Sequence, residues 1–333
     1  MKKKLPLAGA LRSKAFTLVV LLVILVALFT VLASVNNTRF FTARTFIGIL
    51  SDLAVPSFLA IGAGCLIVSG NIDLSQASVG AMAGVILAVG ISWWQIPWWG
   101  AIVLAIAASA AAGLLNAVIV NELGIAPFVT TLAISSVIKG ITMLLSTDPG
   151  NILVSSIAFT TPATDAIAAA SFGDIPATAI VMVAAFIVYG LMLAKTKLGK
   201  SIYLIGCNRV AARLSGLGEK KISYFLFINC SALGGVSGVI LSLRSKQGTM
   251  LALQSDQFTG VTAAILGGIS FSGGSGGMGG AFMGLLVIKT FNKGMMIADS
   301  NTYLTFVLSG VLLIAALTMD YVSVRRQRKR AGA

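Results

Sequence analysis

Histidine is absent from this chain of 333 residues, cysteine occurs three times, and only 10% of the residues are charged. Without histidine the chain cannot build a Ser-His-Asp triad or a histidine-containing zinc site. The cysteines Cys65, Cys207 and Cys230 follow no metal-ligand spacing, and we interpret them as small buried apolar side chains. No constellation of titratable groups indicates an enzyme, so we expect no catalytic site, metal or cofactor.

Nucleotide-binding motifs are also missing. No G-x-x-x-x-G-K-[ST] occurs, so any ATP that drives this protein must be bound by another polypeptide. The string GSGGMG at 274–279 fits G-x-G-x-x-G, but a dinucleotide site needs a strand before it and a helix after it. Apolar segments flank it here. We interpret its glycines as residues that let backbones bend or pack closely within a membrane.

What the chain has in abundance is apolar sequence, with 57% hydrophobic residues and a mean hydropathy of +0.97. Soluble domains carry about 25% charged residues. The composition therefore predicts an all-α polytopic membrane protein, with residues 1–333 forming one transmembrane domain. The length suits about ten spans of about 20 residues.

Hydropathy and polar breaks divide the chain into spans whose ends are approximate. The first, 15–35, is longer than the apolar core of a signal peptide, so we interpret it as a retained span. All four tryptophans lie between residues 93 and 99, which is typical of a membrane boundary. Short or broken helices are expected near residue 70 and over 257–280. The predicted spans are 15–35, 46–69, 77–93, 98–120, 126–146, 176–194, 222–243, 257–270, 279–297 and 302–321.

Positive charge marks one side of the membrane. Of the 24 Lys and Arg residues, 17 lie near the two termini or within 195–221, each group beside an apolar segment. Because basic residues stay on the cytoplasmic side, both termini and 195–221 are predicted to be cytoplasmic. The stretch 147–175 has three aspartates and no basic residue, which predicts an outer loop. This distribution indicates topology and contact with lipid headgroups, and it does not favour nucleic acid as a partner.

Several charged residues fall within or beside the predicted spans. Asp73, in GNIDLS, is either a functional membrane acid or a cap for the helix that follows it. Asp52 and Lys139 either form a buried pair or line a polar cavity, unless Lys139 extends outward to the interface. Lys289 and Lys293 share one helical face, and we expect both to extend towards an interface.

Within 195–221, the sequence VAARLSGLGEKK predicts a short helix. Ala211 and Ala212 favour helix, Gly216 can end it, and Arg209 and Arg213 would share a face. On composition alone, a solvated loop and a docking site for a partner are equally good interpretations.

The motif AARLSG resembles the coupling loop of ABC importer permeases, whose pattern is E-A-A-x-x-x-G, with Val210 here in the acidic position. Further resemblance extends over nearly the whole chain. It is carried by FIGILSDLAVPSFLAIGAGCLIVSGNIDLS, IAPFVTTLAISSVIKGIT, TKLGKSIYLIGCNRVAARLSGL and AAILGGISFSGGSG. Together these stretches resemble the ribose-type permeases of bacterial sugar ABC importers, within the branched-chain amino acid/ribose permease superfamily.

The resemblance implies a permease without its own ATP site, in the cytoplasmic membrane of a bacterium. Two such chains, identical or not, would form one pore. ABC ATPase subunits would dock on the cytoplasmic coupling segment 195–221. A periplasmic or lipid-anchored binding protein would deliver a pentose, hexose or similar polyol, with the outer loop 147–175 as one candidate docking surface. The implied coupling residues are Asn208, Arg209, Ala211, Ala212, Arg213, Leu214, Ser215 and Gly216. The candidate pore or gate residues are Asn71, Asp73, Ser75, Lys139, Gln257, Gly267 and Gly268.

Departures from the family pattern leave the substrate open. Gln257 and Thr259 stand where the family usually has acidic residues, and Cys207 replaces a glycine. Related permeases import purine nucleosides or autoinducer-type sugar derivatives. The alternative classes are an ion-coupled secondary transporter, which would need mid-span acids, and a membrane-embedded enzyme.

Overall fold

The computed structural model describes residues 14–35, 37–148 and 150–298, together with residues 307, 310, 311, 314 and 318. Most of the two terminal basic clusters, and most of the predicted span 302–321, lie outside the described residues.

Helices account for most of the described chain. The long ones are α2 (Lys14–Val35), α3 (Ala43–Val68), α4 (Gln76–Ser92), α5 (Trp98–Glu122), α6 (Pro127–Leu145), α8 (Ala177–Lys195), α11 (Glu219–Ser245) and α13 (Met278–Ile297). The short ones are α7 (Pro162–Ala169), α9 (Lys197–Cys207), α10 (Arg209–Leu214), η1 (Gln254–Asp256) and α12 (Thr259–Leu266). Four short strands complete the described elements: β1 (Ser156–Ala158), β2 (Ser171–Phe172), β3 (Ile175–Pro176) and β4 (Gln247–Thr249).

Six of the described helices are long and apolar enough to cross a membrane: α2, α3, α5, α6, α8 and α11. The predicted spans 77–93, 257–270 and 279–297 correspond to α4, α12 and α13, which are not among the six. The structure is therefore an all-α polytopic membrane protein, while the count of about ten spans and the cytoplasmic position of the termini stay predictions.

Helix α11 forms the centre of the bundle, where it packs against α3, α4 and α5. Helix α4 is enclosed by protein, because every residue from Gln76 to Gly90 is buried. Helices α2, α5, α6 and α8 instead expose large apolar side chains, such as Val31 at 62% and Val188 at 61%. Such surfaces are suited to lipid, since an α-helix satisfies its own backbone hydrogen bonds.

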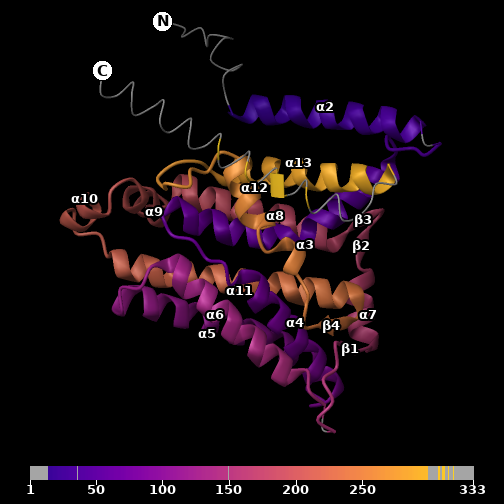
Figure 1. Cartoon of the computed structure of the whole chain (residues 1–333), viewed down its shortest axis with the longest axis horizontal. Coiled ribbons are helices and arrows are strands. Elements are labelled where there is room, and N and C mark those ends of the chain that lie inside the picture. The colour runs from indigo at the N-terminus through magenta and orange to yellow at the C-terminus, as the bar shows by residue number, and fades with distance from the viewer. Residues whose placement is uncertain are drawn as a thin grey trace, which may run out of the picture.

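The two ends of the bundle have different characters (Figure 1). At one end, which we call the basic end, α9 and α10 extend beyond the long helices. At the other, the acidic end, β1 to β4 and α7 gather around residues 147–175. Strand β1 pairs antiparallel with β4, and the Lys246 ammonium lies 2.9 Å from the Asp165 carboxylate. The predicted outer loop is thus a folded cap on the end opposite to the predicted coupling segment.

The expected helix breaks near residues 70 and 257–280 are present, and they share one geometry. Gly70 and Gly268 have φ of +78° and +95°. The N–H groups of Gly70 and Asn71 donate to Ile67 and Leu66, and those of Gly268 and Ile269 donate to Ile265 and Ala264. This is the Schellman ending, which requires a residue in the left-handed region and favours glycine there. The same stop therefore ends both α3 and α12.

Candidate functional site

The short helix α10 is built by local capping. The Asn208 side chain accepts a hydrogen bond from the Ala211 N–H at 3.0 Å, which starts the helix. Gly216, with φ of +77°, ends the turn, and the Leu217 N–H donates to the Ala212 carbonyl at 3.1 Å. The predicted helix with its stop at Gly216 is therefore confirmed. The wider segment 195–221 is mostly helical, because α9 precedes α10.

The two arginines of α10 share a face, as predicted, and that face is turned towards the start of α11. Arg213 Nη2 lies 2.8 Å from the Glu219 carboxylate, and Arg209 Nη1 lies 3.9 Å from it. Arg209 also reaches into the bundle, where its Nη2 donates to Asn71 Oδ1 at 2.5 Å and to the Gly70 carbonyl at 3.3 Å. Arg209 therefore connects α10 to the break that follows α3.

A second face of α10 has no partner among the described residues. Val210 and Leu214, four positions apart, are 68% and 84% exposed, although Ala212 on the same short helix is buried. Exposed apolar side chains beside arginines are characteristic of protein interfaces. Beside α10 lies a cavity of about 280 Å³, whose lining includes Asn71, Asn121 and Arg209. This end of the molecule thus presents an exposed apolar face, and Arg209 joins the same short helix to the bundle interior.

The glycine-rich stretch after α12 lies against the same break. The Gly274 N–H donates to the Val68 carbonyl at 2.8 Å, which joins the two interrupted segments. Gly206 on α9 lies so close to both that an added Cβ would be 1.9 Å from the Val68 oxygen and 2.5 Å from the Gly274 nitrogen. The glycines therefore serve close packing. GSGGMG carries no dinucleotide site geometry, since a helix and no strand precedes it.

Two side chains of α9 hold this glycine-rich stretch from the other side. The Tyr203 hydroxyl donates to the Gly276 carbonyl at 2.6 Å, and the Cys207 thiol lies 3.5 Å from the Gly274 carbonyl. Burial, above all, raises the pKa of Tyr203, so its hydroxyl keeps the proton that it donates. Cys207 is exposed, so the interpretation of the cysteines as buried is wrong for it and confirmed for Cys65 and Cys230.

Asp73 and Ser75 belong to a buried polar network between helices. Asp73 Oδ1 accepts from the Ser75 N–H at 2.7 Å and from its hydroxyl at 2.6 Å, at the start of α4. Ser75 Oγ accepts from Asn116 of α5 at 2.9 Å, and Asp73 Oδ2 lies 3.4 Å from Ser231 Oγ of α11. Asp73 is 2% exposed. Ser75 is the N-cap residue of α4 and no side chain caps the helix, so Asp73 orders the turn before α4 instead of capping it, and a role in the gate stays a prediction.

The remaining pore candidates lie in three places. Asn71 is at the cavity beside α10, and Lys139 and Gln257 both line a small cavity of about 10 Å³. Gly267 is packed against α13, because an added Cβ would lie 2.2 Å from the Gly280 carbonyl carbon. Gly268 forms the Schellman ending described above. The seven candidates therefore do not share one cavity, and whether they contact substrate stays a prediction.

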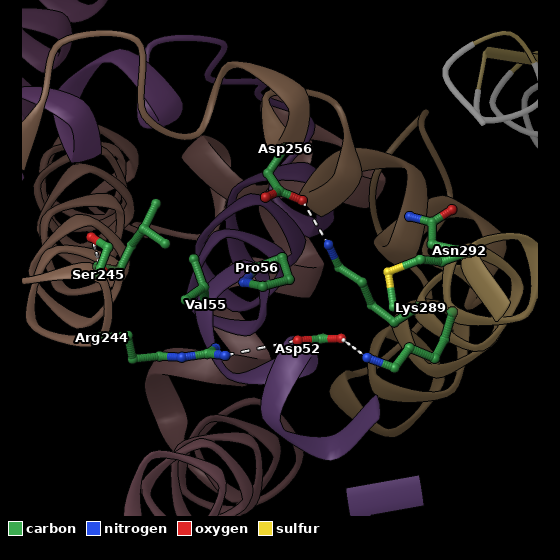
Figure 2. Close-up of a pocket in the computed structure, with 11 residues that line it drawn as sticks. Asp52, Val55, Pro56, Arg244, Ser245, Asp256, Lys289 and Asn292 are labelled. Atoms are coloured by element: carbon green, nitrogen blue, oxygen red, sulfur yellow. Dashed lines mark hydrogen bonds and ion pairs between the residues drawn. The ribbon is translucent and has the colours of Figure 1, made fainter. Parts of the chain in front are cut away.

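A cavity of about 450 Å³ is lined by residues that were not among the pore candidates, although one of them, Asp52, was expected to line a polar cavity if it did not pair with Lys139 (Figure 2). We call it the charged pocket. Its charged lining residues are Asp52, Arg244, Asp256, Lys289 and Lys293. Figure 2 shows Arg244 directed at Asp52 across the pocket, and Asp256 directed at Lys289.

The ion pairs of the charged pocket correct two predictions. Asp52 Oδ2 lies 3.1 Å from Lys293 Nζ, and Asp52 Oδ1 lies 3.8 Å from Arg244, so Lys139 is not its partner. Lys289 Nζ lies 2.9 Å from Asp256, and the Lys289 and Lys293 side chains are 14% and 19% exposed. Both lysines therefore turn into the protein instead of extending to an interface. Sequence spacing could not reveal this, since Asp52 and Lys293 are 241 positions apart.

Helix α3 passes through Pro56 without a break. Proline frees a backbone carbonyl and strains the turn before it. Here two hydroxyls bond to neighbouring carbonyls: Ser57 to Leu53 at 2.6 Å and Ser237 of α11 to Val55 at 2.7 Å. Val55 and Pro56 form the helical wall of the charged pocket between Arg244 and Lys289 (Figure 2).

Comparison with known proteins gives matches along nearly the whole chain. Residues 45–317 match the family described as branched-chain amino acid transport system / permease component. The ribose import permease protein RbsC of Bacillus subtilis is 29% identical over 291 residues, 87% of this chain and 88% of RbsC. In Escherichia coli K12, the D-allose transport system permease protein AlsC is 29% identical over 300 residues, 90% of this chain and 89% of AlsC.

A third relative is the L-arabinose transport system permease protein AraH of Escherichia coli K12. It is 27% identical over 308 residues, 92% of each chain. No solved structure matches this chain.

Proposed function

Because the chain belongs to the family of permease components of the branched-chain amino acid transport system, we propose that it is the membrane subunit of a bacterial ABC importer for a small sugar. The substrate would be a pentose, a hexose or a similar polyol, which would pass inward across the cytoplasmic membrane. Relatives whose names specify ribose, allose and arabinose match this chain almost from end to end, which supports this substrate class. ATP would be hydrolysed by a separate subunit, since the chain has no P-loop.

The observation that carries this proposal is the pair of contacts made by Arg209. A transport subunit driven from outside needs a docking face and a rigid connection from that face to the substrate path. In this proposal the ATPase docks on α10, through Asn208 to Gly216, and contacts the exposed Val210 and Leu214. Arg209 transmits the movement of α10 to Gly70 and Asn71, where α3 ends.

The helix break beside Asn71 is placed so that such a movement would displace other parts of the bundle. It is bonded to the glycine-rich stretch through Gly274 and Val68, and residues that follow it start α4 through Asp73 and Ser75. A displacement of Asn71 would therefore reach both interrupted segments and the buried helix α4. Packed elements with two discrete arrangements convert a small local shift into a larger one. This gives Asn71, Asp73 and Ser75 a gating role without requiring that they touch sugar.

The other partners follow from the two ends of the bundle. A substrate-binding protein would dock at the acidic end on 147–175, where Phe172 is 81% exposed. A second permease chain, identical or related, would complete the pore, and α2, α5, α6 and α8 would face lipid or that chain. The orientation rests on the positive-inside rule, which puts α10 in the cytoplasm.

Uptake in cells tests the proposal. The permease would be expressed, with and without its ATPase and binding protein, in a bacterium that lacks its own ribose, allose and arabinose importers. We expect labelled sugar to accumulate only in the strain with all components, and the ATPase to co-purify with a tagged permease. Accumulation that needs no ATPase and is abolished by a protonophore would instead establish an ion-coupled transporter. Accumulation of a purine nucleoside but of none of the three sugars would overturn the substrate class.

A further inference from the structure

We propose that the charged pocket is a binding site for an uncharged polyol during its passage through the permease, an inference that rests on the function proposed above. Its charges come from α3, α11, η1 and α13, which surround the cavity. No residue of this pocket was implied by the family resemblance.

Structural stabilisation does not account for the pocket. Ionisable groups within the membrane region are costly, and replacing a buried ion pair by well-packed apolar side chains is often neutral or stabilising. Lys289, Lys293 and Asp256 have side chains less than one-fifth exposed. A structural ion pair would be packed tightly, whereas these groups border about 450 Å³ of open space. That volume lies within the range of about 300–1,000 Å³ for small-molecule sites.

The arrangement of charges favours a hydroxyl-rich ligand without net charge. A hydroxyl group both donates and accepts a hydrogen bond, so it can bridge a carboxylate and a cation. The separation of 3.8 Å between Arg244 and Asp52 exceeds hydrogen-bond length and leaves both groups able to take a hydroxyl (Figure 2). A carboxylate ligand would have to compete with Asp52 and Asp256 for the three cations. A cationic ligand would be repelled by the same three cations.

The pocket also lies on the side from which a delivered sugar would enter. Arg244 is the second-last residue of α11, and the chain then runs through Lys246, which pairs with Asp165 of the acidic end, into β4. Lys293 lies in the last third of α13, whose N-terminus follows the glycine-rich stretch near the basic end. The charged pocket is therefore nearer to the acidic end, where the binding protein is proposed to dock.

Protection of an introduced cysteine tests the assignment. Ser245 lines the pocket and is exposed, and Ser34 near the end of α2 is exposed but does not line it. Ser245→Cys and Ser34→Cys would each be made with Cys207→Ser, because Cys65 and Cys230 are buried. In the reconstituted full transporter, a membrane-impermeant maleimide would be added with D-ribose, D-allose, L-arabinose or gluconate.

We expect the sugar that the transporter imports to slow labelling of Ser245→Cys saturably, without changing that of Ser34→Cys. An imported sugar that leaves the labelling of Ser245→Cys unchanged would overturn the assignment. Protection by gluconate but not by the imported sugar would overturn the uncharged ligand class. If the unmodified transporter imports none of the three sugars, the proposed function itself fails, and this is a separate result.

Charge variants give a second readout. Asp52→Asn and Lys289→Met should each lower sugar uptake about 10–100-fold, since each removes a charge-assisted contact to the ligand. Glu122→Gln is the matched control, because it breaks an ion pair of 2.7 Å with Lys220 outside the pocket, and its uptake should stay near the unmodified rate. Normal uptake in both pocket variants would contradict the assignment. If the two pocket variants fail to fold, the cysteine-protection experiment still tests whether the pocket binds the sugar.

Discussion

The contact between Arg209 and the break after α3 gives the sharpest mechanical prediction. Arg209→Met keeps the length of the side chain but removes both hydrogen bonds, to Asn71 Oδ1 and to the Gly70 carbonyl. A hydrogen bond to a charged group contributes about 1.5–3 kcal/mol. The Arg209 side chain is 45% exposed, so we discount the pair together to about 1–2 kcal/mol. Since about 1.4 kcal/mol corresponds to a factor of ten, transport should fall about tenfold.

The defect should be one of coupling and not of assembly. Val210 and Leu214 remain exposed in Arg209→Met, so the ATPase should still co-purify and hydrolyse ATP. Sugar uptake into proteoliposomes and ATP hydrolysis would be measured on the same preparation, to give the sugar moved per ATP. Asn71→Ala should reproduce part of the defect, because it removes the bond to Asn71 Oδ1 and leaves the bond to the Gly70 carbonyl. The double variant should then add little to Arg209→Met, since both changes remove the bond between these two side chains.

Glu122→Gln is the matched control. Glu122 pairs with Lys220 at 2.7 Å at the same end of the bundle, but it lies outside 195–221 and makes no described contact to the break. Its uptake should change little, as expected for an exposed ion pair. Full uptake by Arg209→Met, or defects of Arg209→Met and Asn71→Ala that add in the double variant, would refute transmission through this contact.

Three further variants test neighbouring parts of the site. Gly206→Ala places a methyl group against the Val68 oxygen and should cost about 1–3 kcal/mol, seen as a lower melting temperature in detergent. Gly140→Ala, with no atom within 4 Å of the new Cβ, is its control. Gly216→Pro combined with Arg213→Glu disrupts the end of α10 and its pair with Glu219, so the ATPase should no longer co-purify; unchanged co-purification would argue against docking there. Tyr203→Phe loses the bond to Gly276 and should be less stable than the unmodified protein by about 1 kcal/mol. Because the folded state raises the pKa of Tyr203 above its ordinary value of 10.0, this difference should be constant below that pH and shrink as the pH rises from there through the raised value.

Local chemistry is what could be predicted from the sequence. The alanines and the stop at Gly216 act within one turn, so the short helix and its end were predicted, whereas its cap at Asn208 was not. The breaks after α3 and α12 were found for the same reason, because glycine is required where the chain takes a positive φ. The membrane class followed from composition, and the family from motifs in the right order.

Long-range pairing could not be predicted. The partners of Asp52 come from α11 and α13, and no spacing rule relates positions so far apart. A lysine side chain is long enough to reach outward to the membrane interface or inward to a buried partner. The shared helical face of Lys289 and Lys293 therefore could not predict which of the two each side chain does. The strand pairing of Ile157 with Gly248 was also hidden, since three-residue strands in a polar loop leave no periodic pattern.

The most direct test of the central claim is the initial rate of labelled-sugar uptake into proteoliposomes that contain the permease, its ATPase and its binding protein. D-ribose, D-allose and L-arabinose would be tested with ATP, without ATP, and with a proton or sodium gradient alone. We predict uptake of at least one of these sugars that requires ATP and both partner proteins and is unaffected by the gradients. Equal uptake on an ion gradient alone, without the ATPase, would contradict the account.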